Sequence, residues 1–143
     1  MIAVIQRVKK AEIRNLPNTE IERGLVVFVA FEKEDNFEKF EKFINKILNL
    51  RVFEDENNKM NLSLKDISGQ LLLVSNFTIA GSLEKGNRPS FDRALEVEKA
   101  REFFEKLKQE FLKHYQNIKF GEFQAYMEVE IINDGPVTLV YRI

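Results

Sequence analysis

The sequence predicts a single α+β domain with a mainly antiparallel, barrel-like sheet and two amphipathic helices. Two observations lead to this class. Several runs rich in Val, Ile, Leu and Phe are typical of buried strands, and two longer segments repeat their apolar residues at helical spacing. Strands and helices do not alternate regularly, which argues against a doubly wound parallel sheet. The length of 143 residues fits one domain over 1–143, because it suffices for one core but not for two.

The first third of the chain is expected to form two strands and a helix. Residues 1–10 alternate loosely between apolar and polar side chains, as a strand does. The unbroken apolar run within 21–31 is typical of a buried strand. Phe and Ile recur every three or four residues in the next segment, which predicts a helix over 36–50 with Asp35 or Asn36 as its N-cap.

The middle of the chain reads as strands and a long loop. Residues 51–53 and 60–64 look like short strands around the polar turn at 54–58. Residues 70–77 form another apolar run and predict a second buried strand. Two glycines and a proline make 81–91 a loop.

The last third is expected to form a long helix and a hairpin. An apolar stripe predicts a helix over 92–115, with Asp92 as its N-cap. Two strands follow, over 120–132 and 137–143. The Asp-Gly pair in the segment between them, 133–136, is a strong hairpin-turn signal.

Composition narrows the function. With no cysteine and one histidine, His114, the chain cannot build a thiolate or multi-histidine metal site, and we expect no metal or cofactor. His114 itself fits a packing role late in a helix better than a catalytic one. A net charge of −1 favours small, local contact with nucleic acid. Neither a signal peptide nor a membrane-length apolar run is present, so we expect a cytoplasmic protein with no membrane or DNA partner.

Polar side chains interrupt the strand-like run at Ser75, Asn76 and Thr78. Buried polar groups need partners, so these groups either satisfy one another at the end of the strand or wait for a ligand. If the strand continues, alternation places Ser75 with Phe77 on one face and Asn76 with Thr78 on the other. Backbone N–H groups at the strand end would then be available as oxyanion donors. A nucleophilic threonine would need a base, and the local sequence supplies none.

The segment 133–136 allows two interpretations. A hairpin turn explains Asp-Gly, but it leaves Pro136 unexplained at the start of the next strand. A cis Gly135–Pro136 bond would instead turn two carbonyls the same way and give a rigid pair of acceptors. Elsewhere, the basic clusters at 7–10 and at Lys85, Arg88 and Arg93 read as solvated charge that is able to touch a phosphate.

Both motifs resemble those of the D-aminoacyl-tRNA deacylase (D-tyrosyl-tRNA deacylase) family. Ser-Asn-Phe-Thr at 75–78 is similar to the family's Ser-Gln-x-Thr, and Asn-Asp-Gly-Pro-Val-Thr at 133–138 is similar to its Asn-x-Gly-Pro-Val-Thr. Further stretches fit in family order at 1–8, 59–63 and 88–91. One departure stands out: Asn76 replaces the family's Gln. If that side chain must reach the substrate, its contact weakens or passes through water; if only its N–H counts, the change is harmless.

The resemblance implies an enzyme that hydrolyses the ester joining a D-amino acid, or glycine mischarged on tRNA-Ala, to the 3′-terminal adenosine of a tRNA. It implies a homodimer in which the cis Gly-Pro bond enters the partner's active site and clashes with an L-amino acid side chain. The substrate's ribose 2′-hydroxyl would assist attack by water, while the protein positions the ester and stabilises the oxyanion. The implied catalytic residues are Ser75, Phe77 and Thr78, and the implied substrate-binding residues are Met60, Asn76, Asn133, Gly135 and Pro136.

Two other functions remain open from the residues. One is a non-catalytic module that binds an RNA end or a small ligand, because the chain shows no acid–base pair. The other is a general esterase with a threonine nucleophile, which predicts burst kinetics on simple esters.

Overall fold

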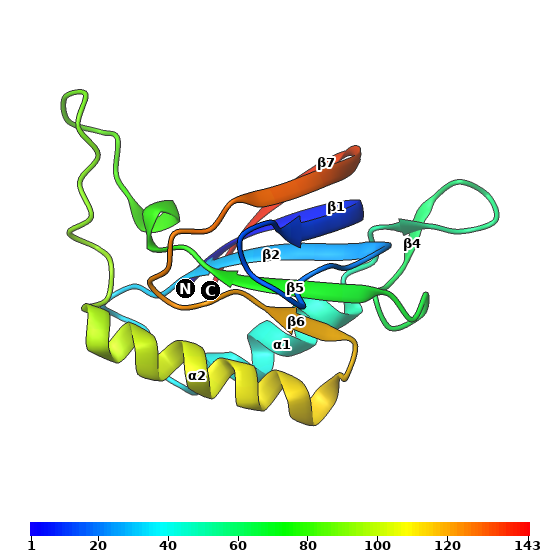
Figure 1. Ribbon diagram of the computed structural model, residues 1–143, viewed down its shortest axis with the longest axis horizontal. Helices are drawn as coiled ribbons and strands as arrows, with labels where there is room; N and C mark the ends of the chain where they lie inside the picture. The colour runs from blue at the N-terminus through cyan, green and yellow to red at the C-terminus, as the bar shows by residue number, and fades with distance from the viewer.

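A computed structural model describes all residues, 1–143, and contains a five-stranded sheet, a two-stranded sheet and two α-helices (Figure 1). The strands are β1 (Ile2–Ile13), β2 (Gly24–Ala30), β3 (Phe53–Glu54), β4 (Met60–Leu62), β5 (Gln70–Ser75), β6 (Ile118–Phe120) and β7 (Val129–Arg142). The helices are α1 (Lys39–Asn49), the 3₁₀ turn η1 (Phe77–Ala80) and α2 (Val97–His114). None of the helices is long and apolar enough to cross a membrane.

The main sheet has the order β6-β5-β2-β1-β7. β1 pairs antiparallel with β2 and β7, whereas β5 runs parallel to both β2 and β6. Each parallel pair needs a crossover, and α1 with the β3–β4 hairpin supplies the first while α2 supplies the second. The predicted α+β class with two amphipathic helices is confirmed. The sheet is open, with β6 and β7 as its edges, and does not close into a barrel.

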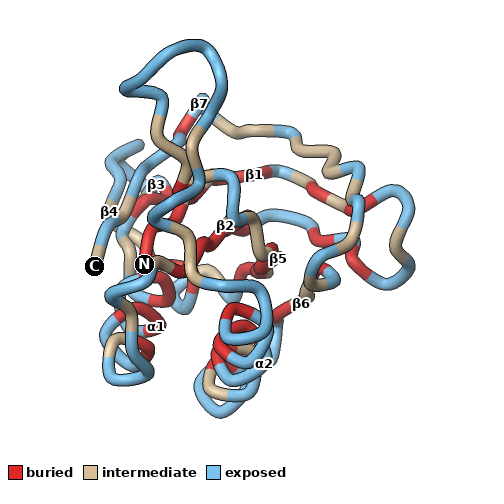
Figure 2. The backbone as a smooth tube through the Cα atoms, turned by 90° about the vertical axis from the view of Figure 1, so that its left-hand side faces the viewer, coloured by how far each residue is buried: buried red, intermediate tan, exposed pale blue.

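Both helices pack on one face of the sheet and build the main core there (Figures 1 and 2). β5 shows how the sequence divides the two faces. Its Leu71 and Leu73 belong to the helix-side core, and Leu72 and Val74 belong to a smaller cluster on the opposite face, as the period of two in a strand requires. The segment between β6 and β7 contributes Met127 to that smaller cluster.

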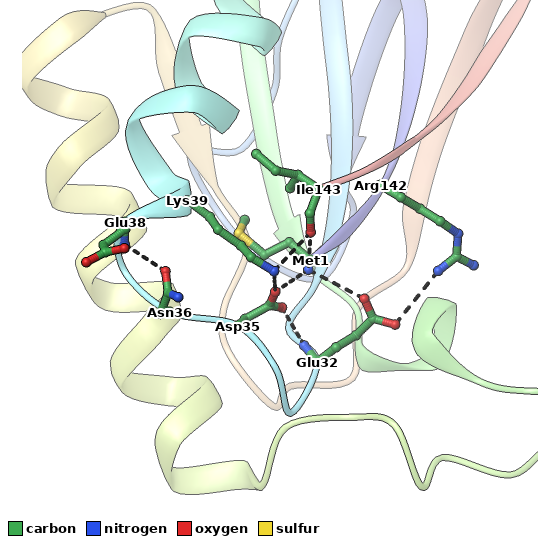
Figure 3. Close-up of polar contacts among 8 residues, drawn as sticks. All are labelled: Met1, Glu32, Asp35, Asn36, Glu38, Lys39, Arg142 and Ile143. Atoms are coloured by element: carbon green, nitrogen blue, oxygen red, sulfur yellow. Dashed lines mark hydrogen bonds and ion pairs between the residues drawn. The ribbon is translucent and has the colours of Figure 1, made fainter.

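α1 begins at Lys39, three residues later than the sequence predicts, because Asp35 is engaged elsewhere. The Asp35 carboxylate binds the Met1 ammonium, accepts a hydrogen bond of 2.7 Å from Lys39 Nζ, and accepts another of 2.7 Å from the Glu32 N–H (Figure 3). Met1 and Lys39 also donate to the carbonyl of Ile143, at 3.1 and 3.2 Å. These contacts tie both ends of the described chain to the segment that follows β2.

The Asp35 side chain is only 1% exposed. Burial alone would raise the pKa of Asp35, but hydrogen bonds from the Glu32 N–H, Lys39 and the Met1 ammonium outweigh burial and hold that pKa below its usual value. The carboxylate therefore stays charged inside the protein and compensates two cations. Its neighbourhood in turn positions residues 93–95, since Lys33 N–H donates to the Arg93 carbonyl at 3.0 Å and Leu95 N–H to the Phe31 carbonyl at 2.9 Å.

β7 is one continuous strand, so the predicted hairpin at 133–136 is wrong. Both halves of β7 pair with β1: Gln6 faces Thr138 and Val8 faces Asn133. Two steps along β1 thus correspond to five along β7, and the three extra residues leave the ladder as a bulge. A partner strand of twelve residues is long enough to pair on both sides of the bulge.

Two further boundaries differ from the sequence prediction. β5 ends at Ser75 and the chain turns into η1, so the predicted face alternation through Thr78 is wrong. α2 begins at Val97 with Glu96 as its N-cap, because the Asp92 carboxylate accepts a hydrogen bond of 2.7 Å from the Ser90 hydroxyl instead.

Candidate active site

A cavity of about 700 Å³ opens beyond the carboxyl ends of the parallel strands β2 and β5. Crevices form at such ends because neighbouring strands lead their chains away in different directions. Fifteen of its nineteen lining residues are hydrophobic, which makes it an apolar pocket with few polar groups. The polar lining residues are Ser75, Asn76, Glu96 and Gln124.

Three of those polar side chains already have partners. Asn76 caps η1, Glu96 caps α2 by accepting 2.9 Å from the Lys99 N–H, and Gln124 accepts 2.7 Å from Arg101. Only Ser75 has a side chain free of any hydrogen bond within the chain. Glu96 is the only carboxylate in the lining, and one of its oxygens is engaged in the cap of α2.

The motif at 75–78 forms a turn that Asn76 organises. The Asn76 N–H donates to the Val29 carbonyl at 2.9 Å, which fastens the turn to β2. Its side-chain oxygen accepts from the Thr78 N–H at 3.3 Å and from the Thr78 hydroxyl at 2.6 Å. This N-cap geometry suits the short Asn side chain, because the carbonyl oxygen reaches back to its own turn. Asn76 and Thr78 do satisfy each other, as one of the two interpretations expected, whereas the Ser75 hydroxyl has no partner in the chain.

The Phe77 N–H remains without an acceptor in the chain, because it occupies the first position of the 3₁₀ turn. Phe77 is 57% exposed, and its ring meets the Phe91 ring edge-on, with centroids 5.1 Å apart. The turn thus presents a free backbone donor beside an aromatic wall. Thr78 is exposed and lies outside the cavity lining.

Side-chain hydrogen bonds hold the bulge at 133–136 in shape. The Asn133 amide donates to the Thr138 hydroxyl at 2.9 Å, and its oxygen accepts from the Val137 N–H at 2.9 Å. Between these anchors, Gly135 has φ of +140° and the Gly135–Pro136 peptide bond is cis. A Cβ at Gly135 would lie 2.8 Å from the Val137 side chain, so only glycine fits.

Arg7 fastens the bulge to the body of the protein. It is 6% exposed, although the sequence placed it in a solvated cluster. Its Nε donates to the Asp134 carbonyl at 2.9 Å and its Nη1 donates to the Val52 carbonyl at 2.8 Å. The Asp134 carboxylate lies 3.6 Å from Nε and supplies a counter-charge. Sequence reasoning missed this residue because its carbonyl partners are more than forty positions away.

The structure separates the predicted site residues of the two motifs into two groups, one at 75–78 and the other at 133–136. Ser75 is in register with Val29 and hence with Ala3 of β1, whereas Asn133 faces Val8 of the same strand. Five residues of β1 correspond to about 17 Å along the strand, and three strand spacings of about 4.8 Å separate β5 from β7. Figure 1 shows η1 and the β4 end of the molecule on opposite sides.

Met60 does not join the residues around Ser75. It lies on β4, is 54% exposed and does not line the cavity. Most of the lining residues that the sequence did not single out come from two segments, 91–97 and 123–127, and the others lie on or beside β2, β5, α2 and β7. Phe91, Phe123 and Tyr126 are the aromatic residues of these segments. An aromatic residue in a loop is the one sequence feature that could have indicated that they line a cavity.

Comparisons with known proteins agree on one family. The family model described as D-Tyr-tRNA(Tyr) deacylase matches residues 4–142. Two similar proteins, both named D-aminoacyl-tRNA deacylase, come from Thermodesulfovibrio yellowstonii and Methylacidiphilum infernorum. The first is 44% identical over 98% of this chain and 97% of its own, and the second is 49% identical over 96% and 97%.

Solved structures share the fold over nearly the whole chain. One, titled c-Myc DNA Unwinding Element Binding Protein, is 40% identical with a TM-score of 0.93, covering 100% of this chain and 99% of its own. Another, titled as a structural analysis of a probable eukaryotic D-amino acid tRNA deacylase, is 14% identical with a TM-score of 0.84, covering 99% and 98%, and shows the fold alone. Because the family model and close relatives span almost every residue, including both motifs, this chain belongs to the D-Tyr-tRNA(Tyr) deacylase family.

Proposed function

We propose that this protein hydrolyses the ester joining a D-amino acid, or glycine, to the 3′-terminal adenosine of a tRNA, and leaves L-aminoacyl esters intact. The observation that carries the proposal is the family match over residues 4–142, which includes both motifs in full. Glycine mischarged on tRNA-Ala falls within the same proposal, because a filter that rejects an L side chain has nothing to reject in glycine. Such an enzyme proofreads translation in the cytoplasm.

The aminoacyl end of the tRNA would bind in the cavity beside η1. The aromatic residues Phe77, Phe91 and Tyr126 offer surfaces on which an adenine base is able to stack. The free Phe77 N–H points to a role as an oxyanion donor for the ester carbonyl. Ser75 and Asn76 complete the polar edge of this pocket.

Substrate-assisted hydrolysis accounts for the absence of a base hydrogen-bonded to Thr78. Thr78 would need one to become a nucleophile, yet its hydroxyl donates to the Asn76 amide oxygen, which does not take up a proton near neutral pH. The vicinal ribose 2′-hydroxyl supplies the missing polar group and assists the attack of water. The protein then contributes position and oxyanion stabilisation, with Thr78 placing the ester or the water.

Rejection of L-amino acids would come from a second copy of the chain. Gly135 and Pro136 lie too far from Ser75 in one copy to act on the same substrate. β7 is an edge strand with apolar side chains exposed at Ile132, Leu139 and Val140. An edge strand of this length presents unpaired backbone N–H and C=O groups, which another chain is able to cover. A homodimer through this side would bring the bulge of one subunit to the cavity of the other.

Parallel hydrolysis of D-, L- and glycyl-tRNA by the purified protein tests the proposal. Loss of the D-aminoacyl and glycyl esters, with the L-ester intact, is the expected result. Equal hydrolysis of both enantiomers would contradict the proposed filter.

Binding without hydrolysis is the second candidate. One similar structure carries a DNA-binding title, and the cavity holds no acid–base pair. This candidate predicts a stable complex with an oligonucleotide or tRNA and no loss of ester over time, so the same timed assay separates the two functions.

A further inference from the structure

Residues 82–90 form an arm at the rim of the cavity, and Figure 1 shows it standing clear of the sheet. Its two ends are joined by a pair of backbone hydrogen bonds between Ser82 and Ser90, of 2.7 and 3.0 Å. Gly86 turns the chain at the tip with φ of +65°. Residues 83–89 are exposed, so nothing within the subunit covers the arm.

The base of the arm is built into the site. Gly81, directly before the arm, fits so closely that an added Cβ would lie 2.8 Å from the Phe91 ring and 2.9 Å from the Thr78 carbonyl. Phe91, directly after the arm, lines the cavity and packs against Phe77. The arm therefore projects from a fixed position next to the place where the aminoacyl end is proposed to bind.

The tip carries free positive charge. Lys85 and Arg88 take part in none of the ion pairs of the chain. The acids nearby are engaged below the tip: Glu84 faces Arg93 at 3.9 Å, and Asp92 accepts from the Ser90 hydroxyl. On a chain with net charge −1, two unpaired cations on an arm rooted at the cavity rim form a local basic site.

We propose that this arm binds the phosphates of the single-stranded 3′ end of the tRNA, with Lys85 and Arg88 as the contacting residues. The inference rests on the proposed function, because it places the terminal adenosine in the adjacent cavity. A single strand that leaves the cavity carries its nearest phosphates past the rim, where cations on a projecting element meet them. Two such contacts are few enough to suit a protein of near-neutral charge.

The test compares two substrates that carry the same D-amino acid: the full aminoacyl-tRNA and the aminoacyl ester of adenosine, which has no phosphate. The variant is Lys85→Ala with Arg88→Ala. The matched control is Lys42→Ala with Lys46→Ala, which removes two exposed, unpaired lysines from α1. Exchange of the two residues, Lys85→Arg with Arg88→Lys, keeps the charge of the arm.

The arm variant is expected to lower the ratio of kcat/KM for the tRNA to kcat/KM for the adenosine ester. Two lost contacts reduce the log–log salt slope by about 1.4, so the effect of raising salt from 50 to 200 mM shrinks about sevenfold in the variant. The α1 control and the charge-keeping exchange should retain the wild-type ratio and slope.

Each other outcome overturns the proposal. Equal losses on both substrates would mean that the arm acts through Phe91 and the cavity rather than through phosphates. An unchanged ratio and salt slope in the arm variant would mean that it binds no phosphate. Failure of the proposed function is a separate result, since the wild-type protein would then hydrolyse neither D-ester.

Discussion

Gly135→Ala perturbs the proposed filter with a single methyl group. The backbone there has φ of +140°, which side-chain-bearing residues rarely adopt, and the new Cβ would lie 2.8 Å from Val137 Cγ2 and 3.1 Å from Arg7 Nη2. Strain of this kind costs about 1–3 kcal/mol. For a chain of this length the entropy of unfolding is about 0.3 kcal/mol/K, so Tm should fall by about 3–10 °C.

The functional effect of Gly135→Ala should exceed its effect on stability. The bulge relieves the clash by moving, so its carbonyls leave the position from which, in the proposed mechanism, they reject an L side chain. We expect the ratio of D- to L-ester hydrolysis to fall at least tenfold, which corresponds to about 1.4 kcal/mol of lost discrimination. The assay is parallel hydrolysis of both aminoacyl-tRNAs at a temperature well below the Tm of the variant.

Gly86→Ala is the matched control for this substitution. It adds the same methyl group at a positive φ of +65°, but no atom lies within 4 Å of the new Cβ. The control should lose about 1–2 kcal/mol of stability from the positive φ alone and keep its D/L ratio. A folded Gly135→Ala protein with wild-type Tm and D/L ratio would refute the reasoning about the bulge.

Three further predictions follow from named contacts. Arg7→Lys keeps the charge but leaves one of two buried carbonyls unpaired, so urea denaturation should show a loss of about 1–3 kcal/mol; a stability equal to wild type would contradict the anchoring role. Because the pKa of Asp35 is lower in the folded chain, its contribution to stability is present above the unfolded pKa of about 3.9 and is lost as pH falls through the folded pKa. Asp35→Asn should therefore lower the free energy of unfolding near pH 7 and make it depend less on pH in the acid range, as measured by urea titrations. A variant whose free energy of unfolding depends on pH as in the wild type would contradict this role of Asp35. Thr78→Ala should slow deacylation modestly without abolishing it, and an acyl adduct on Thr78 detected by mass spectrometry would overturn substrate assistance.

Local patterns predicted most of the fold. Periodicity located both helices, and apolar runs located β1, β2 and β5, because a strand or helix of that length must bury one face. The errors came from partners far along the chain. Asp35 does not cap α1, since its carboxylate binds the Met1 ammonium, and no window of sequence contains both residues.

The site shows the same division between local and distant information. The turn at 75–78 was recognisable because Ser, Asn and Thr interrupt an apolar run, yet its geometry depends on the Asn76 cap, and the strand ends two residues earlier than the pattern suggests. The Asp-Gly signal at 134–135 suggested a hairpin, but β1 is long enough to pair on both sides and converts the turn into a bulge. The sequence did not predict that Arg7 is buried and holds the bulge, because its burial depends on carbonyl acceptors from two other segments of the chain.

A covalent link between the two motifs would test most directly whether two copies of the chain form one site. The chain has no cysteine, so Phe77→Cys combined with Asp134→Cys creates the only thiols. A disulfide requires Cα atoms closer than about 7 Å, which the separation within one copy excludes. After oxidation, the doubly substituted protein should run as a covalent dimer on a non-reducing gel, while each single variant and a Phe77→Cys/Lys106→Cys control remain monomeric. A doubly substituted protein that stays monomeric would contradict the claim that the bulge of one subunit lies at the active site of the other.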